Sequence, residues 1–574
     1  MLFSIFYPVQ AFFETEFVLS KKLEFIRSIQ YWEVSHMSVF GEFVLSSGST
    51  PLSNCSEWWW LPYDQLNTAF LPKDRSIGVI LIESLQKGTS RPYHKQKLCI
   101  LLSNMRHFAL ELVELGHHVR YITTDGSYAN VLHSITSEGH SVHVCRPAEL
   151  ALRNELSVLA DQGSIQYHHH PGWLTKREWF EQAIGTSPPF RMDRFYQRVR
   201  KELDVLMEGG SPIGGKYSHD GDNRQPWKGE PPAQKPPVFV CDEIDNEVIA
   251  LVNERFPDHP GTARLDAHPT SQQDLHLALE HAKTVLVHFG PYEDAFSEQS
   301  RSLFHSKLAA VLNLHRVLPQ DLMNMALELE IPLSSKEGYF RQLIWREYVF
   351  HIHDITNGFA TLEIPTSPNK HRNARWNDED VDEADHPNAL QQIEPLPPVF
   401  WGKKSSLRCL DVVVEQVLDE GWTHHIPRLM VLSNIAQLLD VNPRELTDWF
   451  HVAFVDAYDW VVEPNVLGMG TFALGDSMMT KPYVSGAAYI NRMGDSCKSC
   501  VFNPKKDCPI TRLYWNYFER HKEHFAKNHR LAMTLRTLER RAPEQKELDA
   551  RVFKATQETL RKGQALAVDF TDFE

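Results

Sequence analysis

The chain has 574 residues, 42% of them hydrophobic and 23% charged, so it holds enough apolar material for about three to four globular domains. This composition excludes collagen-like, wholly disordered and disulfide-scaffold proteins. The formal net charge of −15 excludes a protein that coats nucleic acid with a uniformly basic surface, but it allows a local basic face.

The start of the chain and its cysteines indicate a reducing compartment away from membranes. Residues 1–55 have no regular hydrophobic period and are interpreted as an N-terminal extension, a candidate for disorder. Their apolar start has no basic flank and is interrupted by Glu14 and Glu16, so it does not resemble a signal peptide. The 8 cysteines are not distributed as a disulfide framework, and no run of 18 apolar residues occurs. We expect a cytoplasmic protein.

The next part of the chain has the pattern of an α/β domain. Apolar runs at 76–83, 118–124 and 141–145 predict buried strands, and the spacing of apolar residues in 95–115 predicts a helix. Strands that alternate with helices predict a Rossmann-like parallel sheet, here over 56–190. No G-x-G-x-x-G motif follows these strands, so the usual dinucleotide fingerprint is absent.

The rest of the chain is predicted to be mainly helical. Residues 191–244 are rich in Gly and Pro and are interpreted as an interdomain linker. Helical periods then dominate 245–574, apart from an acidic insert at about 361–400 that contains six acids within eight positions. The stretch 511–562 is basic, which suits either contact with DNA phosphates or a solvated helix face.

Four cysteines in the last third of the chain predict a metal centre. Cys497, Cys500 and Cys508 form a C-x2-C-x7-C-P motif, and Cys409 lies 88 positions before Cys497. Three clustered thiols and one remote thiol can complete a shell of four thiolates around an iron–sulfur cluster or a zinc ion. Free structural thiols are the remaining alternative, and the spacing does not choose between iron and zinc.

Eight ordered sequence blocks accompany the cysteines. They are RPYHKQKL (91–98), MRHFALEL (105–112), DNRQP (222–226), EGYFRQLIWREY (337–348), HHIPRLM (424–430), PNVLGMG (464–470), TKPYVSGAAYINRM (480–493) and LYWNYFERH (513–521). Together they resemble the iron–sulfur branch of the photolyase–cryptochrome family, which includes bacterial (6-4) photolyases and photolyase-related proteins. The resemblance covers about 56–545.

The resemblance implies an architecture and a set of cofactors. An α/β N-terminal domain would precede an all-α domain that binds FAD and ends in an iron–sulfur region. A [4Fe–4S] cluster would be bound by Cys409, Cys497, Cys500 and Cys508. Members of this family are blue-light flavoproteins, and the photolyases among them transfer an electron from excited reduced flavin to a flipped-out pyrimidine photoproduct.

The resemblance also assigns roles to single residues. Repair of a (6-4) lesion needs a proton donor, for which we predict His425 supported by His424. Trp449 and Trp401 are predicted to relay electrons to the flavin. The predicted flavin contacts are Ser306, Gln342, Arg346, Arg428, Asn434 and Asp456. The predicted lesion contacts are Arg224, Trp345 and Tyr483, because arginine pairs with phosphate and aromatic rings hold an extruded base.

Some positions bear on an antenna chromophore or depart from the family pattern. Asp64 and Gln65 resemble contacts to a 6,7-dimethyl-8-ribityllumazine antenna in the N-terminal domain. Lys87 stands where some relatives carry an acidic contact to that chromophore, which argues against it. Phe450, next to Trp449 of the predicted relay, stands where relatives can carry Tyr. Val462 stands where some relatives carry Glu close to the flavin ring, so flavin protonation and radical stability are expected to differ here.

We therefore expect a light-dependent DNA repair enzyme, of (6-4) photolyase type, that acts as a monomer on UV-damaged DNA at the nucleoid. The alternative is a cryptochrome with the same cofactors, no repair activity and a protein partner. A third hypothesis is a zinc-bearing nucleic-acid-binding module without photochemistry.

Overall fold

The structure, a computed structural model, describes residues 39–46, 51–368 and 385–567. The chain divides into two compact units, residues 1–49 and 50–574. Helix α2 (Val39–Ser46) is the described part of the first unit. Most of the predicted N-terminal extension, and all but one of the six acids in the predicted insert, lie outside the described residues.

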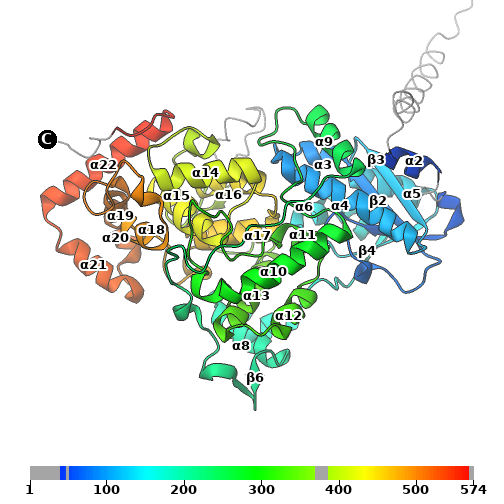
Figure 1. The fold of residues 1–574 in the computed structure, drawn as a ribbon, viewed down its shortest axis with the longest axis horizontal. Helices are drawn as coiled ribbons and strands as arrows, with labels where there is room; N and C mark the ends of the chain where they lie inside the picture. Colours follow the sequence, from blue (N-terminus) through cyan, green and yellow to red (C-terminus); the bar gives the residue numbers. More distant parts are fainter. Residues whose placement is uncertain (1–38, 47–50, 369–384, 568–574) are drawn as a thin grey trace, which may run out of the picture. The chain divides into compact units, whose positions relative to one another are not determined.

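The second unit begins with a parallel sheet of five strands in the order β3-β2-β1-β4-β5 (Figure 1). The strands are β1 (Glu57–Leu61), β2 (Gly78–Ser84), β3 (Val119–Thr124), β4 (Ser141–Cys145) and β5 (Ile165–His168). Strands β2, β3 and β4 confirm the three predicted from apolar runs. The sheet and the helices that follow it also confirm the predicted order of an α/β part and a helical part.

Strand β1 lies in the centre of the sheet, where no strand was predicted. It runs between β2 and β4, and four of its five residues are buried. A strand buried on both faces does not alternate between apolar and polar residues, so its three tryptophans give no periodic signal. Trp58 pairs in register with Gly78, where a Cβ atom would lie 2.5 Å from the indole ring. Glycine at position 78 therefore makes room for the central tryptophan.

Helices connect and flank the strands of the sheet. Helix α4 (Lys95–Glu114) matches the helix predicted over 95–115. The other helices of this part are α3 (Leu85–Thr89), α5 (Tyr128–Ser137), α6 (Leu150–Asp161), α7 (Arg177–Ile184) and α8 (Met192–Glu202). Helix α8 buries Phe195, Tyr196 and Val199 and packs against α7, so the predicted linker starts with a helix that belongs to the core.

The remaining helices build one large hydrophobic core, shown from green to red in Figure 1. They are α9 (Glu243–Arg255), α10 (Gln272–Tyr292), α11 (Ala309–Asn313), α12 (Pro319–Glu328), α13 (Leu333–Ile355), α14 (Arg408–Glu420), α15 (Asn434–Leu438), α16 (Pro443–Ala453), α17 (Asp459–Glu463), α18 (Ala487–Met493), α19 (Pro509–Arg520), α20 (Lys522–Phe525), α21 (Ala532–Glu539) and α22 (Pro543–Arg561). Helix α9 packs on α4, and α10 packs on α13. None of the described helices has the length and apolar character needed to cross a membrane.

Short elements complete the fold. They are the hairpins β6–β7 (Met207–Glu208, Ser211–Pro212) and β8–β9 (Thr366–Pro368, Asp385–Pro387), the 3₁₀ turns η6 (Pro398–Trp401) and η10 (Ser496–Lys498), and the π-helices η7 (Pro427–Ser433) and η8 (Pro464–Gly470). The two π-helices contact each other, and a Cβ atom at Gly470 would lie 2.8 Å from Ser433 Oγ. Glycine thus lets η8 approach η7, and π-helical turns are often found at functional sites.

Candidate functional site

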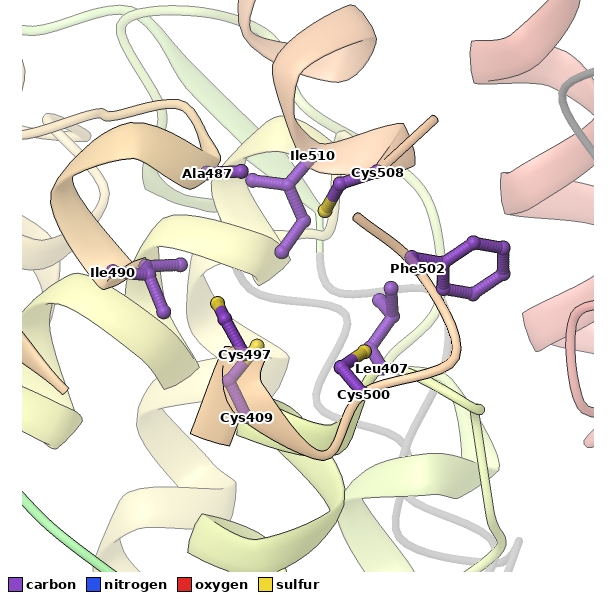
Figure 2. Close-up of a pocket in the computed structure, with 9 residues that line it drawn as sticks. All are labelled: Leu407, Cys409, Ala487, Ile490, Cys497, Cys500, Phe502, Cys508 and Ile510. Carbon is purple, nitrogen blue, oxygen red and sulfur yellow. The ribbon is translucent and has the colours of Figure 1, made fainter. Parts of the chain in front are cut away.

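The four predicted cysteine ligands meet around one cavity. Cys409 lies at the start of α14, Cys497 in η10, Cys500 in the following loop and Cys508 at the N-cap of α19. Figure 2 shows all four among the residues that line one pocket, whose other walls are apolar. None of the four is in a disulfide. The fold therefore gathers thiols that are far apart in sequence.

The sulfur atoms of the four cysteines are not gathered as tightly as a bound zinc ion would require. A zinc ion bound by four thiolates at about 2.3 Å would bring the sulfur atoms to about 3.8 Å from one another. Among the described residues, three or more potential ligand atoms come within 4.8 Å of one another at two histidine-containing groups, but not at these cysteines. Burial raises the pKa of Cys497 to about 11 and that of Cys508 to about 12, and neighbouring thiols add to the effect. Thiolates at this site would therefore need a bound cation.

The predicted proton donors lie at the start of the helix that contains η7. His424 is buried, whereas the side chain of His425 is 37% exposed. The ring of His424 stacks on that of His305, with centroids 4.0 Å apart. Burial, and then the charge of neighbouring groups, lowers the pKa of His424 well below its usual value and that of His305 to about 3. The two buried rings are therefore neutral.

His425 points toward an acidic residue that sequence reasoning missed. Its Nε2 atom lies 3.8 Å from the carboxylate of Asp294. The same carboxylate accepts a hydrogen bond from Tyr489 at 3.3 Å and lies 3.8 Å from Arg224. Burial opposes ionisation of Asp294, but His425, Arg224 and Tyr489 together hold its pKa below the usual value. The predicted donor and one predicted lesion contact thus share one anion.

The predicted electron relay forms part of a continuous aromatic row. Trp449 is fully buried and donates its indole N–H to the carbonyl oxygen of Phe400 at 2.9 Å. Its ring lies 5.2 Å from that of Phe400 and 5.8 Å from that of Phe454. Trp401 follows Phe400 in η6, which packs against α14, the helix that carries Cys409. The row therefore ends beside the helix of the cysteine site.

The other end of this row reaches two predicted flavin contacts. Arg428 forms a bidentate ion pair with Asp456, at 3.0 and 2.9 Å, and its guanidinium lies 4.2 Å from the ring of Phe454. Asn434 exchanges two hydrogen bonds with the backbone of Ser485, at 3.1 and 2.9 Å. These contacts connect η7 with the segments around α17 and α18.

The remaining predicted flavin contacts lie on or near α13. Gln342 donates to Glu293, and Ser306 is a hydrogen-bond partner of Tyr339, whose pKa burial raises to about 12. Arg346 points elsewhere: its Nε donates to Asn313 at 2.9 Å. The Arg346 guanidinium lies 4.6 Å from the ring of Trp173 and 4.9 Å from that of Trp460, and its Nη1 has no hydrogen-bond partner among the described residues.

The three predicted lesion contacts do not all converge. Arg224 and Tyr483 are exposed, and the charge of Arg224 acts on the Tyr483 hydroxyl, whose pKa is raised mainly by burial. The charge of Arg530, which was not predicted, also acts on Tyr483. Trp345 instead donates to Asn465 of η8 at 2.9 Å and packs on Tyr348. Arg224, Tyr483 and Arg530 therefore form the surface beside His425, and Trp345 lies against η8.

A second cavity lies beside the predicted antenna residues. Its walls are Tyr63, Ser84, Leu85, Lys87, Gly88, Tyr93, Lys97, Leu98, Leu101, Leu102, Tyr128, Glu149, Phe256 and Tyr458. Lys87 is paired with Glu149 at 3.0 Å, so an acid does accompany the lysine. Asp64 and Gln65 are buried and do not line this cavity; Asp64 has no hydrogen-bond partner for its carboxylate within the described residues.

Comparisons with known proteins agree with this geometry. A family model described as deoxyribodipyrimidine photo-lyase-related protein matches residues 59–267. The chain is 31% identical over 498 residues to a protein named (6-4) photolyase from Agrobacterium fabrum, covering 83% of this chain and 94% of that protein. The chain belongs to the photolyase-related family. An uncharacterized protein of Acanthamoeba polyphaga mimivirus is 27% identical over 177 residues, which is 29% of this chain and 87% of that protein.

A solved structure supports the fold of this photolyase-related chain. The crystal structure of a bacterial class III photolyase from Agrobacterium tumefaciens matches it with a TM-score of 0.50 and 14% sequence identity, covering 90% of this chain and all of that one. At this identity the likeness shows the fold.

Several residues of the site were not predicted from the sequence. Tyr489 lies inside a quoted block, but Tyr483 was chosen there, and nothing local distinguishes the two tyrosines. His305 lies next to the predicted Ser306, so its position could have suggested a role. Asp294 and Arg530 belong to no motif and gain their significance from the fold alone.

Proposed function

We propose that this protein is a light-dependent (6-4) photolyase that binds FAD and repairs UV-damaged DNA. The observation that carries the proposal is the His424–His425 pair, buried on one side and open toward Arg224 and Tyr483 on the other. Family membership and the similarity to a named (6-4) photolyase support the same activity. When bound, FAD would supply the light-driven electron.

The protein's own residues would bind the flavin and control the proton. Arg428, fixed by Asp456, would set the charge beside the flavin, and Asn434, Ser306 and Gln342 would add polar contacts. The unpartnered Nη1 of Arg346 is available to a ligand. His425 would donate a proton to the lesion, while the neutral His424 fills the space behind it. Trp401 and Trp449 would relay electrons to the flavin.

We also propose a [4Fe–4S] cluster bound by Cys409, Cys497, Cys500 and Cys508. The apolar walls and the wide separation of the thiols support a cluster rather than zinc. The second cavity is the proposed antenna site; most of its walls belong to a proposed antenna domain at 56–190, and Phe256 and Tyr458 come from the rest of the chain. Residues 245–574 form the proposed flavin and iron–sulfur domain. The four tyrosines in the walls of the second cavity suit a planar ring such as ribityllumazine.

DNA would approach the surface beside His425. Arg224 and Arg530 would contact phosphates, and Tyr483 would stack on the extruded base. The basic stretch 511–562 contributes less than its composition suggests, because several cations there are paired with carboxylates of the protein. Examples are Arg512 and Arg541 with Asp549, and Lys546 with Glu519.

Anaerobic photorepair of (6-4)-containing DNA tests the proposal. Purified protein with reduced flavin should restore the lesion under blue light and show flavin and iron–sulfur absorption. The variant His424→Ala/His425→Ala should keep its flavin and lose repair. The matched control is His117→Ala/His118→Ala, an adjacent pair before β3, which should repair normally. Flavin-loaded protein that restores no lesion would contradict the proposal and favour a cryptochrome with a protein partner.

A further inference from the structure

Asp294 lies where an anion is unfavourable for DNA binding. It follows α10, its side chain is 18% exposed, and it borders the surface formed by Arg224 and Tyr483. A carboxylate at this position repels the phosphates that the arginine would attract. Affinity for DNA therefore does not explain why an aspartate occupies position 294.

The segment that carries Asp294 is held firmly. The preceding Glu293 is buried and accepts hydrogen bonds from Asn223 at 2.6 Å, from Arg341 at 2.9 Å and from Gln342. A Cβ atom at Gly338 would lie 2.9 Å from the Asn223 amide and 3.0 Å from the Glu293 carboxylate, so this network leaves no space for a larger residue. The Asp294 carboxylate is thus presented in a fixed direction.

The carboxylate distinguishes between the two adjacent histidines. It lies 3.8 Å from Nε2 of His425, whereas the ring of His424 stacks on that of His305. A metal ion does not explain the cluster of His305, His424 and His425, although their nitrogen atoms lie within 4.8 Å of one another. The rings of His305 and His424 are nearly parallel, at 21°, so their in-plane lone pairs run side by side rather than converge on one ion.

We infer that Asp294 is a positioning residue that orients the ring of His425 and directs it toward the lesion. This inference rests on the proposed function and adds the group that holds the second histidine of the pair in place. Tyr489 supports the arrangement: burial and the charge of Asp294 raise the pKa of Tyr489, so its hydroxyl stays protonated and donates to the carboxylate. The ring of His425 lies near those of His305 and His424, and Asp294, which His425 approaches, also lies near Arg224 and Tyr489.

The variant Asp294→Asn tests the inference, because asparagine keeps the shape and removes the charge. DNA binding should be unchanged or tighter, whereas the repair rate at neutral pH should fall at least about tenfold. The alkaline midpoint of repair should also move to lower pH by about one unit, since a nearby anion favours an imidazolium. The control Asp220→Asn removes an acid that pairs with Arg224 and should tighten DNA binding with a repair rate within about twofold of the native rate.

A repair rate and pH profile of Asp294→Asn equal to those of the native protein would overturn the inference. If the native protein itself restores no lesion, the proposed function fails. The role of Asp294 can then be tested separately by NMR on histidine-labelled protein. The His425 signal, identified by its absence in His425→Ala, should titrate at a lower pH in Asp294→Asn than in the native protein. An unchanged midpoint there would refute the role of Asp294 independently of repair.

Discussion

Substitution of Trp449 by Phe separates electron relay from simple core packing. The indole is fully buried and its N–H is bonded to the Phe400 carbonyl oxygen. Loss of that hydrogen bond costs about 1 kcal/mol, and the smaller ring gives up about 1–2 kcal/mol of burial and packing. We expect the free energy of unfolding to fall by about 2–3 kcal/mol in total, which leaves a folded, flavin-binding protein.

The matched control is Trp58→Phe in strand β1. Trp58 is equally buried and donates its indole N–H to the Cys55 carbonyl oxygen at 3.2 Å, but it lies in the sheet, outside the aromatic row. Both variants should lose similar stability in denaturant unfolding. Blue-light reduction of bound flavin by an external thiol, followed by absorption, should be abolished in Trp449→Phe and retained in Trp58→Phe. Normal photoreduction in Trp449→Phe, or equal loss in both variants, would refute the relay.

Three further outcomes follow from the buried groups. Cys409→Ser should reduce iron and acid-labile sulfide measured per chain, whereas Cys55→Ser should not; stoichiometric zinc without iron in the native protein would contradict the cluster. Burial raises the pKa of Asp64 to about 7, so the folded chain keeps a proton that the unfolded chain releases near pH 4. The free energy of unfolding therefore falls as the pH rises from about 4 to about 7. In urea unfolding, Asp64→Asn should raise the free energy of unfolding by up to about 4 kcal/mol at pH 8 and leave it unchanged at pH 4. Arg428→Ala leaves Asp456 buried and unpaired, so the flavin-free protein should lose about 3 kcal/mol of unfolding free energy, and an unchanged urea midpoint would show that the pair is not stabilising.

The fold could be predicted where hydrophobic periods are local. Helix α4 and strands β2 to β4 show regular apolar patterns that reflect their buried faces. Strand β1 was missed because both of its faces are buried, and β5 because three of its four residues are exposed. In each case the burial that defines the strand is set by neighbouring strands and not by its own sequence.

The residues of the site could be predicted where they belong to short sequence motifs. The cysteine spacing and the histidine doublet are of this kind, and both sets come together in the fold. Asp294 and Tyr489 could not be predicted, because their contact joins the end of α10 to α18, Asp294 belongs to no motif, and nothing local marks Tyr489 within its sequence block. Such groups matter through the charge and the direction they impose on a neighbour, which depend on distance in space.

The histidine doublet shows why two neighbouring residues of the same type can have different roles. His424 is buried against the ring of His305, and its pKa is lowered chiefly by this burial and then by neighbouring charges such as that of Arg428. His425 turns outward to Asp294 and is 37% exposed, so a lesion could reach it. A proton donor must be accessible to the lesion, and of the two histidines only the second meets this condition. His424 packs behind His425 and fixes its direction. The different roles of the two histidines therefore come from their surroundings.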